Sequence, residues 1–289
     1  MTGPRGLAVD PVAGAKTSLR KQPPRIDICP IGAVFGEWDT APLFDPKQND
    51  PPHSAIDQFF QATRDLNVLL PRPTYTPQLG HLVLLGHMSA VESYFRTMIR
   101  RVILIDPTAQ ASVYHMDINY AAALHHRDMK LLPEALFEKT SFSSPGAILE
   151  ALKNFLGIAG PAPPQVQTVL KEFGKVCHIR HCLVHRFGKL GSRNAVHLGL
   201  TKHSKLLEKP LAARYEDLQI AFDILRQCVT VVNNHVFYML VTRIADWKGA
   251  WRLDKRRFQD YYDTFATATD QPSSDSIETI YGALITRGA

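Results

Sequence analysis

The residues best suited to chemistry lie close together between Cys177 and Gly191. This stretch is the densest run of histidines and arginines in the chain, with His178, Arg180, His181, His185 and Arg186. A histidine can give or take a proton near neutral pH, whereas an arginine stays charged and binds phosphate oxygens through its planar fork. Cleavage of RNA by its own 2′-hydroxyl needs a base, an acid and a cation, and it needs no metal. These residue types fit that chemistry.

Arg180 stands where a helix would normally carry an apolar residue. A helix is expected to start near Gln165, and its inward face is marked by Val166, Val169, Phe173 and Val176. Arg180 continues that face, so it needs a buried partner or a cleft. His185 lies five residues further on, about 140° around the helix from Arg180. A cleft is therefore needed to collect both side chains, and a two-fold axis beside it would bring the same pair from a second subunit.

A second helix carries polar residues that could border the same cleft. Ser89, Glu92, Arg96 and Arg100 fall within about 80° of one another, beside an apolar stripe. We expect Glu92 to orient Arg180 or a histidine, and Arg96 and Arg100 to contact RNA phosphates. The alternative for Glu92 and Arg96 is a surface ion pair one helical turn apart.

The positive charge of the chain is concentrated around the histidine-rich stretch. The net charge is +6 and the isoelectric point is near 9.1. Residues 171 to 214 hold ten Lys or Arg against two Glu, a local balance of +8. This massing favours contact with a polyanion, and we expect Arg186, Lys189 and Arg193 to bind RNA. The alternative is a solvated loop without a ligand.

Arg180 and His185, with His181 directly after the arginine, resemble the signature of the HEPN ribonuclease superfamily. That signature is an Arg, four to six residues, and then a His. The stretch from Ser89 to Arg96 is similar to an early helix of these proteins, in which a Glu follows a small residue by three. The resemblance covers roughly residues 80 to 245. The motif also falls at a helix end followed by glycines, as in abortive-infection and toxin members.

The resemblance implies an all-α, HEPN-like helical bundle that acts as a homodimer. It implies a metal-independent, cofactor-free endoribonuclease that cleaves single-stranded or looped RNA by 2′-hydroxyl attack. The residues it makes catalytic are Arg180, His185, His181 and Glu92. Such a protein would be a toxin or antiphage defence effector with an antitoxin or other regulatory partner. One toxin subgroup carries a Tyr two residues after the motif His, where a partner modifies it. Phe187 stands there in this chain, which argues against control by that route.

Two other hypotheses stay open at this point. A catalytically silent HEPN-like module would bind RNA, a nucleotide or a protein. A zinc-dependent hydrolase would use His178, His181 and His185, with Cys177 or Cys182, although closed zinc sites usually recruit ligands from separate segments.

Apolar spacing of three and four predicts the helices that position these residues. A stripe from Leu84 to Val102 predicts a helix that ends before Pro107, and a stripe from Leu218 to Met239 predicts one long enough to project or to form an interface. Further helices are expected over Asp117–Phe137, over Pro145–Leu156 with Ser144 as its N-cap, and over Trp251–Phe265.

The two ends of the chain read differently from its middle. We expect a proline-rich, partly extended arm over 1–55, a helical domain over 56–268, and a linker with a short amphipathic tail over 269–289. Residues 26 to 44 are apolar enough to dock on the domain or to add a short strand. The four cysteines are expected to be reduced thiols. No signal peptide and no membrane span are visible, so a cytoplasmic protein is expected.

Overall fold

A computed structural model describes residues 28–29, 36–49, 51–126, 128–270 and 272–288 of the chain. It divides into two compact units, Met1–Asp50 and Pro51–Ala289. The described part of the first unit contains one short 3-10 turn, η1 (Ala41–Leu43), and no strand. Residues 26–27 and 30–35 of the predicted apolar segment lie outside the described residues.

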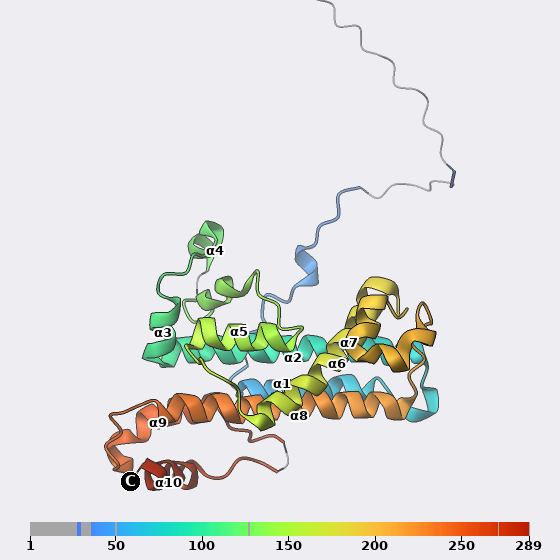
Figure 1. Ribbon diagram of the computed structural model, residues 1–289. Coiled ribbons are helices and arrows are strands. Elements are labelled where there is room, and N and C mark those ends of the chain that lie inside the picture. Colours follow the sequence, from blue (N-terminus) through green and yellow to red (C-terminus); the bar gives the residue numbers. More distant parts are fainter. Residues whose placement is uncertain (1–27, 30–35, 50, 127, 271, 289) are drawn as a thin grey trace, which may run out of the picture. The chain divides into compact units, whose positions relative to one another are not determined.

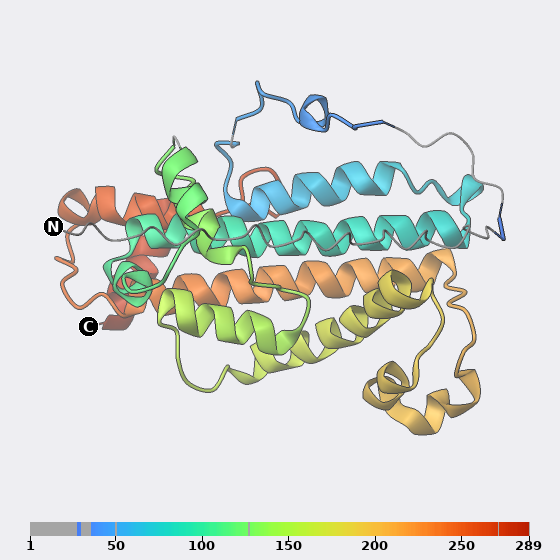
Figure 2. The ribbon, with the colours of Figure 1, turned by 90° about the horizontal axis from the view of Figure 1, so that it is seen from above.

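The second unit is all-α, as predicted: the described residues form helices and no strand. Its centre is a pair of long helices, α2 (Pro77–Ile105) and α8 (Tyr215–Thr242), with α1 (Ala55–Val68) packed on α2. Figure 2 shows these three helices lying lengthwise side by side, with α6 crossing them obliquely.

The predicted apolar stripes form the core of this unit. Every member of the α2 stripe from Leu84 to Val102 is at most 3% exposed. The α8 stripe is buried from Leu218 to Val236, and only its last member, Met239, is half-exposed. Tyr94 of α2 also donates a hydrogen bond to Asn233 of α8 at 3.1 Å. Because α8 packs along α2 and α6, its length is accounted for within the fold rather than by a projection.

The single helix predicted over Asp117–Phe137 is wrong. The segment forms a short α4 (Tyr120–His125) and a 3-10 turn, η3 (Leu132–Phe137), after the seven-residue α3 (Pro107–Val113). His126 adopts an extended backbone and ends α4. None of the α4 residues is buried, so packing does not stabilise a longer helix there.

The helices that lead to the histidine-rich stretch follow the prediction closely. α5 (Pro145–Leu156) starts as expected, with the Ser144 hydroxyl accepting from the Ala147 N–H at 3.2 Å. It ends at Gly157, whose φ of +66° suits glycine. α6 (Pro164–Arg186) continues beyond Arg180 to Arg186, so the whole histidine-rich stretch is helical.

A further helix, α7 (Ser192–His203), replaces the solvated loop considered above, and the 3-10 turn η4 (Ser204–Leu206) follows it. α7 contacts α6 and is kinked at Gly199, where φ is +103°. Residues 188–190 pair with residues 208–211 through backbone hydrogen bonds, which close the ends of this segment onto α6. Figure 1 shows α7 lying beside the C-terminal part of α6.

The C-terminal residues pack in cis on the helical unit. α9 (Trp251–Phe265) has the predicted bounds, and α10 (Ile277–Gly288) lies against it. The Tyr281 hydroxyl of α10 donates to the Asp254 carboxylate of α9 at 2.6 Å, and both side chains are buried. None of the helices in the described part of the chain combines the length and the apolarity that a bilayer crossing requires.

Candidate active site

The outer face of α6 carries three histidines in one row. His178, His181 and His185 have helical spacing of three and four, so they share one side of the helix. The opposite side packs into the core through Phe173, Val176 and Leu183. His181 and His185 are therefore exposed and His178 is half-buried, on a helix whose rotation is fixed by its apolar side.

His181 is the centre of a cationic group. Its ring centroid lies 4.4 Å from that of His185. Partial burial lowers the pKa of the His181 imidazole below its ordinary value, and the positive charges of His185, Arg180, Arg193 and His178 lower it further. His181 is therefore neutral at pH 7 and able to accept a proton. No carboxylate is among the charged groups that shift this pKa.

Arg180 directly precedes His181 in α6. Its side chain is half-buried, as expected for a cationic residue on an inward-turning position. Burial raises the pKa of the neighbouring Cys177 thiol to about 12, while the charge of Arg180 lowers it and that of Glu92 raises it. Arg180 and Glu92 thus act on the same thiol from α6 and α2. Among the described residues, however, no ion pair joins Glu92 to Arg180 or to Arg96.

Arg96 and Arg100, the two arginines expected to contact RNA from α2, are engaged inside the fold. Arg96 donates to the carbonyl oxygens of Phe137 and Thr140, both at 3.0 Å. Arg100 is 3% exposed and pairs with Glu134 through its Nε at 2.9 Å. Both hold the 130–140 segment against α2, so the geometry does not support the RNA contacts predicted for them.

The three cations predicted to bind RNA near α7 have different surroundings. Arg186 donates to both oxygens of Glu208 at 2.6 Å, and it packs against Gly191. This contact ties the end of α6 to the segment after α7. Lys189 and Arg193 are exposed. Arg193 is near enough to His181 to lower its pKa, so it belongs to the cationic group.

Asn194 and His197 of α7 lie against His178, although no sequence motif marks either residue. Asn194 is 4% exposed, and its side-chain oxygen lies 3.2 Å from Nδ1 of His178. Its NH₂ group donates to Sγ of Cys182 at 3.2 Å. The ring of His197 stacks on that of His178 with centroids 4.5 Å apart and planes 9° from parallel. Their spacing of three on a helix was the only sequence signal for this pair.

The surroundings of the histidines do not favour the zinc hypothesis. Within the residues that the structure describes, no group of three or more His, Cys, Asp or Glu side chains could hold a metal ion. His178 is instead engaged with Asn194 and His197. Cys182 is buried beside Asn194.

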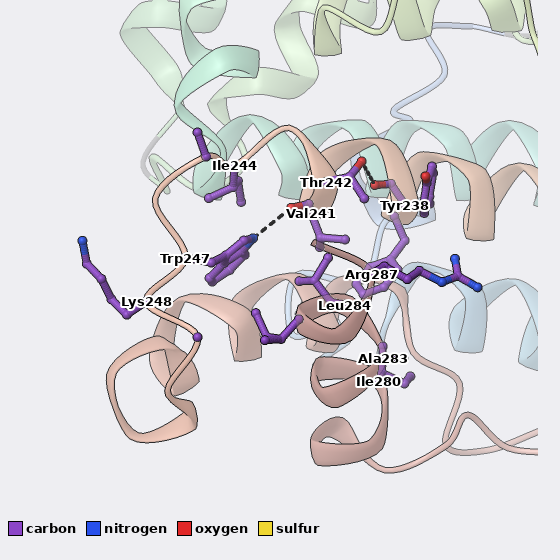
Figure 3. A pocket seen from close by; sticks show the side chains of 14 residues that line it. Tyr238, Val241, Thr242, Ile244, Trp247, Lys248, Ile280, Ala283, Leu284 and Arg287 are labelled. Atoms are coloured by element: carbon purple, nitrogen blue, oxygen red, sulfur yellow. Dashed lines mark hydrogen bonds between the residues drawn. The ribbon is translucent and has the colours of Figure 1, made fainter. Parts of the chain in front are cut away.

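A separate cavity of about 760 Å³ lies between the end of α8 and α10. Figure 3 shows Arg287 of α10 extending beside Tyr238 of α8, while Lys248 points away from both. The described residues that line it are mainly apolar and include no His, Cys, Asp or Glu. The histidines of α6 and α7 are therefore not part of this cavity.

Comparison of the chain with protein families, with curated proteins and with solved structures finds no match.

Proposed function

We propose that this protein is a metal-independent endoribonuclease whose active site is formed by Arg180, His181 and His185. The observation that carries the proposal is the contact between the two imidazoles, within the electrostatic reach of two arginines and without a carboxylate among the charges acting on His181. Such a site offers two adjacent proton carriers and a phosphate-binding cation whose charge acts on one of them.

The groups can be given distinct roles. His181 is neutral at pH 7 and takes the proton from the 2′-hydroxyl as its oxygen attacks the adjacent phosphorus. His185 donates a proton to the departing 5′-oxygen as the P–O5′ bond breaks. Arg180 binds the non-bridging oxygens on which charge develops. The products are a 2′,3′-cyclic phosphate and a 5′-hydroxyl, and the two histidines have exchanged protonation states.

Single-stranded or looped RNA is the proposed substrate. Phe187 follows α6 directly and is 96% exposed, so its ring is open to stacking by an unpaired base. It adopts the left-handed conformation with φ of +51°, which turns the chain sharply at the end of the helix. An exposed aromatic ring beside a cationic group is typical of surfaces that bind single strands.

The biological setting is proposed from the HEPN resemblance alone. It comprises a homodimer, a role as a toxin or antiphage effector, and an antitoxin or other regulatory partner. The four cysteines are unpaired thiols, which suits a reducing compartment, and we therefore place the protein in the cytoplasm.

The proposal is tested by incubating the purified protein with end-labelled RNA in EDTA. We expect products ending in 2′,3′-cyclic phosphate, and we expect Arg180→Ala and His181→Ala to lose cleavage. His125→Ala, which removes an exposed histidine from α4, is the matched control and should cleave like the wild type. A folded wild-type protein that neither cuts nor binds RNA would refute the proposal.

A binding module without catalysis is the second candidate. It is favoured by one observation, that Glu92 does not pair with Arg180, so no carboxylate fixes the guanidinium among the described residues. This candidate predicts that RNA binding survives His185→Ala and weakens steeply with salt.

A further inference from the structure

The α6–α7 surface contains a second pair of imidazoles besides His181 and His185. His178 and His197 stack face to face at 4.5 Å. His197 is exposed and His178 is half-buried. Arg193 precedes His197 by one helical turn and therefore lies on the same side of α7. The proposed active site uses none of these three residues.

Asn194 fixes the tautomer of His178 in this second pair. Its NH₂ group donates to Cys182, so its oxygen is the atom that faces His178. An amide oxygen only accepts hydrogen bonds, and Nδ1 of His178 must therefore carry the hydrogen. Nε2 of His178 is then the atom left to take up a proton. Since Asn194 is buried, this orientation is held by the fold.

The charges that act on His181 are all positive. His178, Arg180, His185 and Arg193 each lower the pKa of its imidazole, and no acidic group is among the charges that shift it. Like charges held together cost free energy, and a bound anion relieves that cost. The exposed side of this cluster therefore favours an anion that contacts several of these cations at once.

The two imidazole pairs are spaced along the helix. His178 and the midpoint of His181 and His185 are five residues apart, about 7.5 Å along α6. Neighbouring phosphates on an extended nucleic acid strand have a similar spacing. Arg193 reaches His181 electrostatically from the helix that carries His197, so it connects the two pairs.

We propose that His178, His197 and Arg193 form a second phosphate subsite, which binds the phosphate next to the scissile one. This inference rests on the proposed function and specifies its substrate: an RNA strand bound through two consecutive phosphates. Arg193 supplies a permanent charge between the two phosphates, and an imidazole N–H of the pair is a donor that a phosphate oxygen can accept.

The test uses a short oligonucleotide with one ribose among deoxyriboses, so that only one linkage is cleavable. In two further substrates, the phosphate immediately 5′ or immediately 3′ of the cleavable linkage is replaced by a neutral methylphosphonate. For the wild type, we expect one of the two replacements to lower kcat/KM about tenfold, which corresponds to about 1.4 kcal/mol. In His197→Ala the same replacement should change kcat/KM less than twofold.

Lys202→Ala is the matched control, because Lys202 is an exposed cation on the same helix beyond the kink at Gly199. It should keep the tenfold effect. The subsite is refuted if neither replacement matters in the wild type, if His197→Ala keeps the full effect, or if Lys202→Ala loses it as well. In each of these cases the cleavage itself still stands. A wild type that cleaves no RNA at all overturns the proposed function and the subsite with it.

Discussion

The arginines of α2 and those of α6 and α7 have similar sequence settings and opposite environments. Arg96 and Arg100 sit beside an apolar stripe, and Arg180 continues one. Arg96 donates to two carbonyl oxygens, and Arg100 forms an ion pair with Glu134. Arg180 and Arg193 instead act through their charge on His181, whose pKa they lower. A cation near a core is thus structural when acceptors from another segment surround it, and a binding candidate when other cations do.

The largest expected difference between the two regions is in stability. Arg100→Ala removes the ion pair with the Glu134 carboxylate and opens a gap in the core, so we expect it to lower the free energy of unfolding by about 3 kcal/mol. Arg193→Ala removes an exposed side chain and should cost less than about 0.5 kcal/mol. Urea unfolding followed by circular dichroism measures both. Equal losses of stability would show that Arg100 and Arg193 do not differ in their structural role.

A buried histidine should make the free energy of unfolding fall in acid, whereas an exposed histidine should not. His87 of α2 is buried against Phe222, and burial lowers its pKa to about 4. The unfolded chain binds a proton near pH 6.5, so the folded state is fully favoured above that pH and loses stability as the pH falls toward 4. The loss should approach 3 kcal/mol. We expect His87→Phe to flatten this pH dependence and His125→Ala to leave it unchanged. An equal slope in wild type and His87→Phe would contradict the assignment.

Asn194 should contribute more than an exposed asparagine. Its replacement by alanine removes the acceptor of His178 and the donor to Cys182 in a buried place. The expected cost is about 2 kcal/mol. Asn234 of α8 is exposed and serves as the control, with an expected change within about 0.5 kcal/mol for Asn234→Ala. Thermal unfolding of the two variants measures the difference, and a neutral Asn194→Ala would show that the amide is not held as described.

The smallest expected effect is a gain in stability at Phe187. This residue has φ of +51° at the end of α6, a conformation that glycine adopts without steric cost. Phe187→Gly should therefore raise the free energy of unfolding by about 1 kcal/mol. Phe187→Ala should give no such gain, because alanine meets the same backbone strain. If both variants lose stability equally, the exposed ring stabilises the fold and is not kept for a ligand.

The sequence predicts a helix well where its apolar spacing and its cap residues indicate the same bounds. The stripe of α2, the Ser144 cap of α5 and the aromatic face of α9 all specify local structure and packing together, and these helices have nearly the expected bounds. The segment 117–137 contains helix-forming residues without a continuous buried face, and it breaks into short turns. α7 was missed because its apolar face is weak and Gly199 interrupts it.

The site was predictable only where it depends on one helix. The row of His178, His181 and His185 follows from spacing on α6 alone. The partners of Arg96 and Arg100 come from residues 130–140, more than 30 positions away in sequence, and no periodic pattern announces them. Asn194 and His197 reach His178 only because residues 188–190 pair with 208–211 and close the ends of the α7 segment onto α6. Such contacts are properties of the tertiary structure.

The most direct test of the central claim is the initial rate of RNA cleavage in EDTA for His185→Ala, compared with the wild type and with His125→Ala. We expect His185→Ala to be slower by at least about 100-fold with an unchanged melting temperature, whereas His125→Ala should not be slowed. Equal rates for the two histidine variants would contradict the claim that α6 carries the catalytic site.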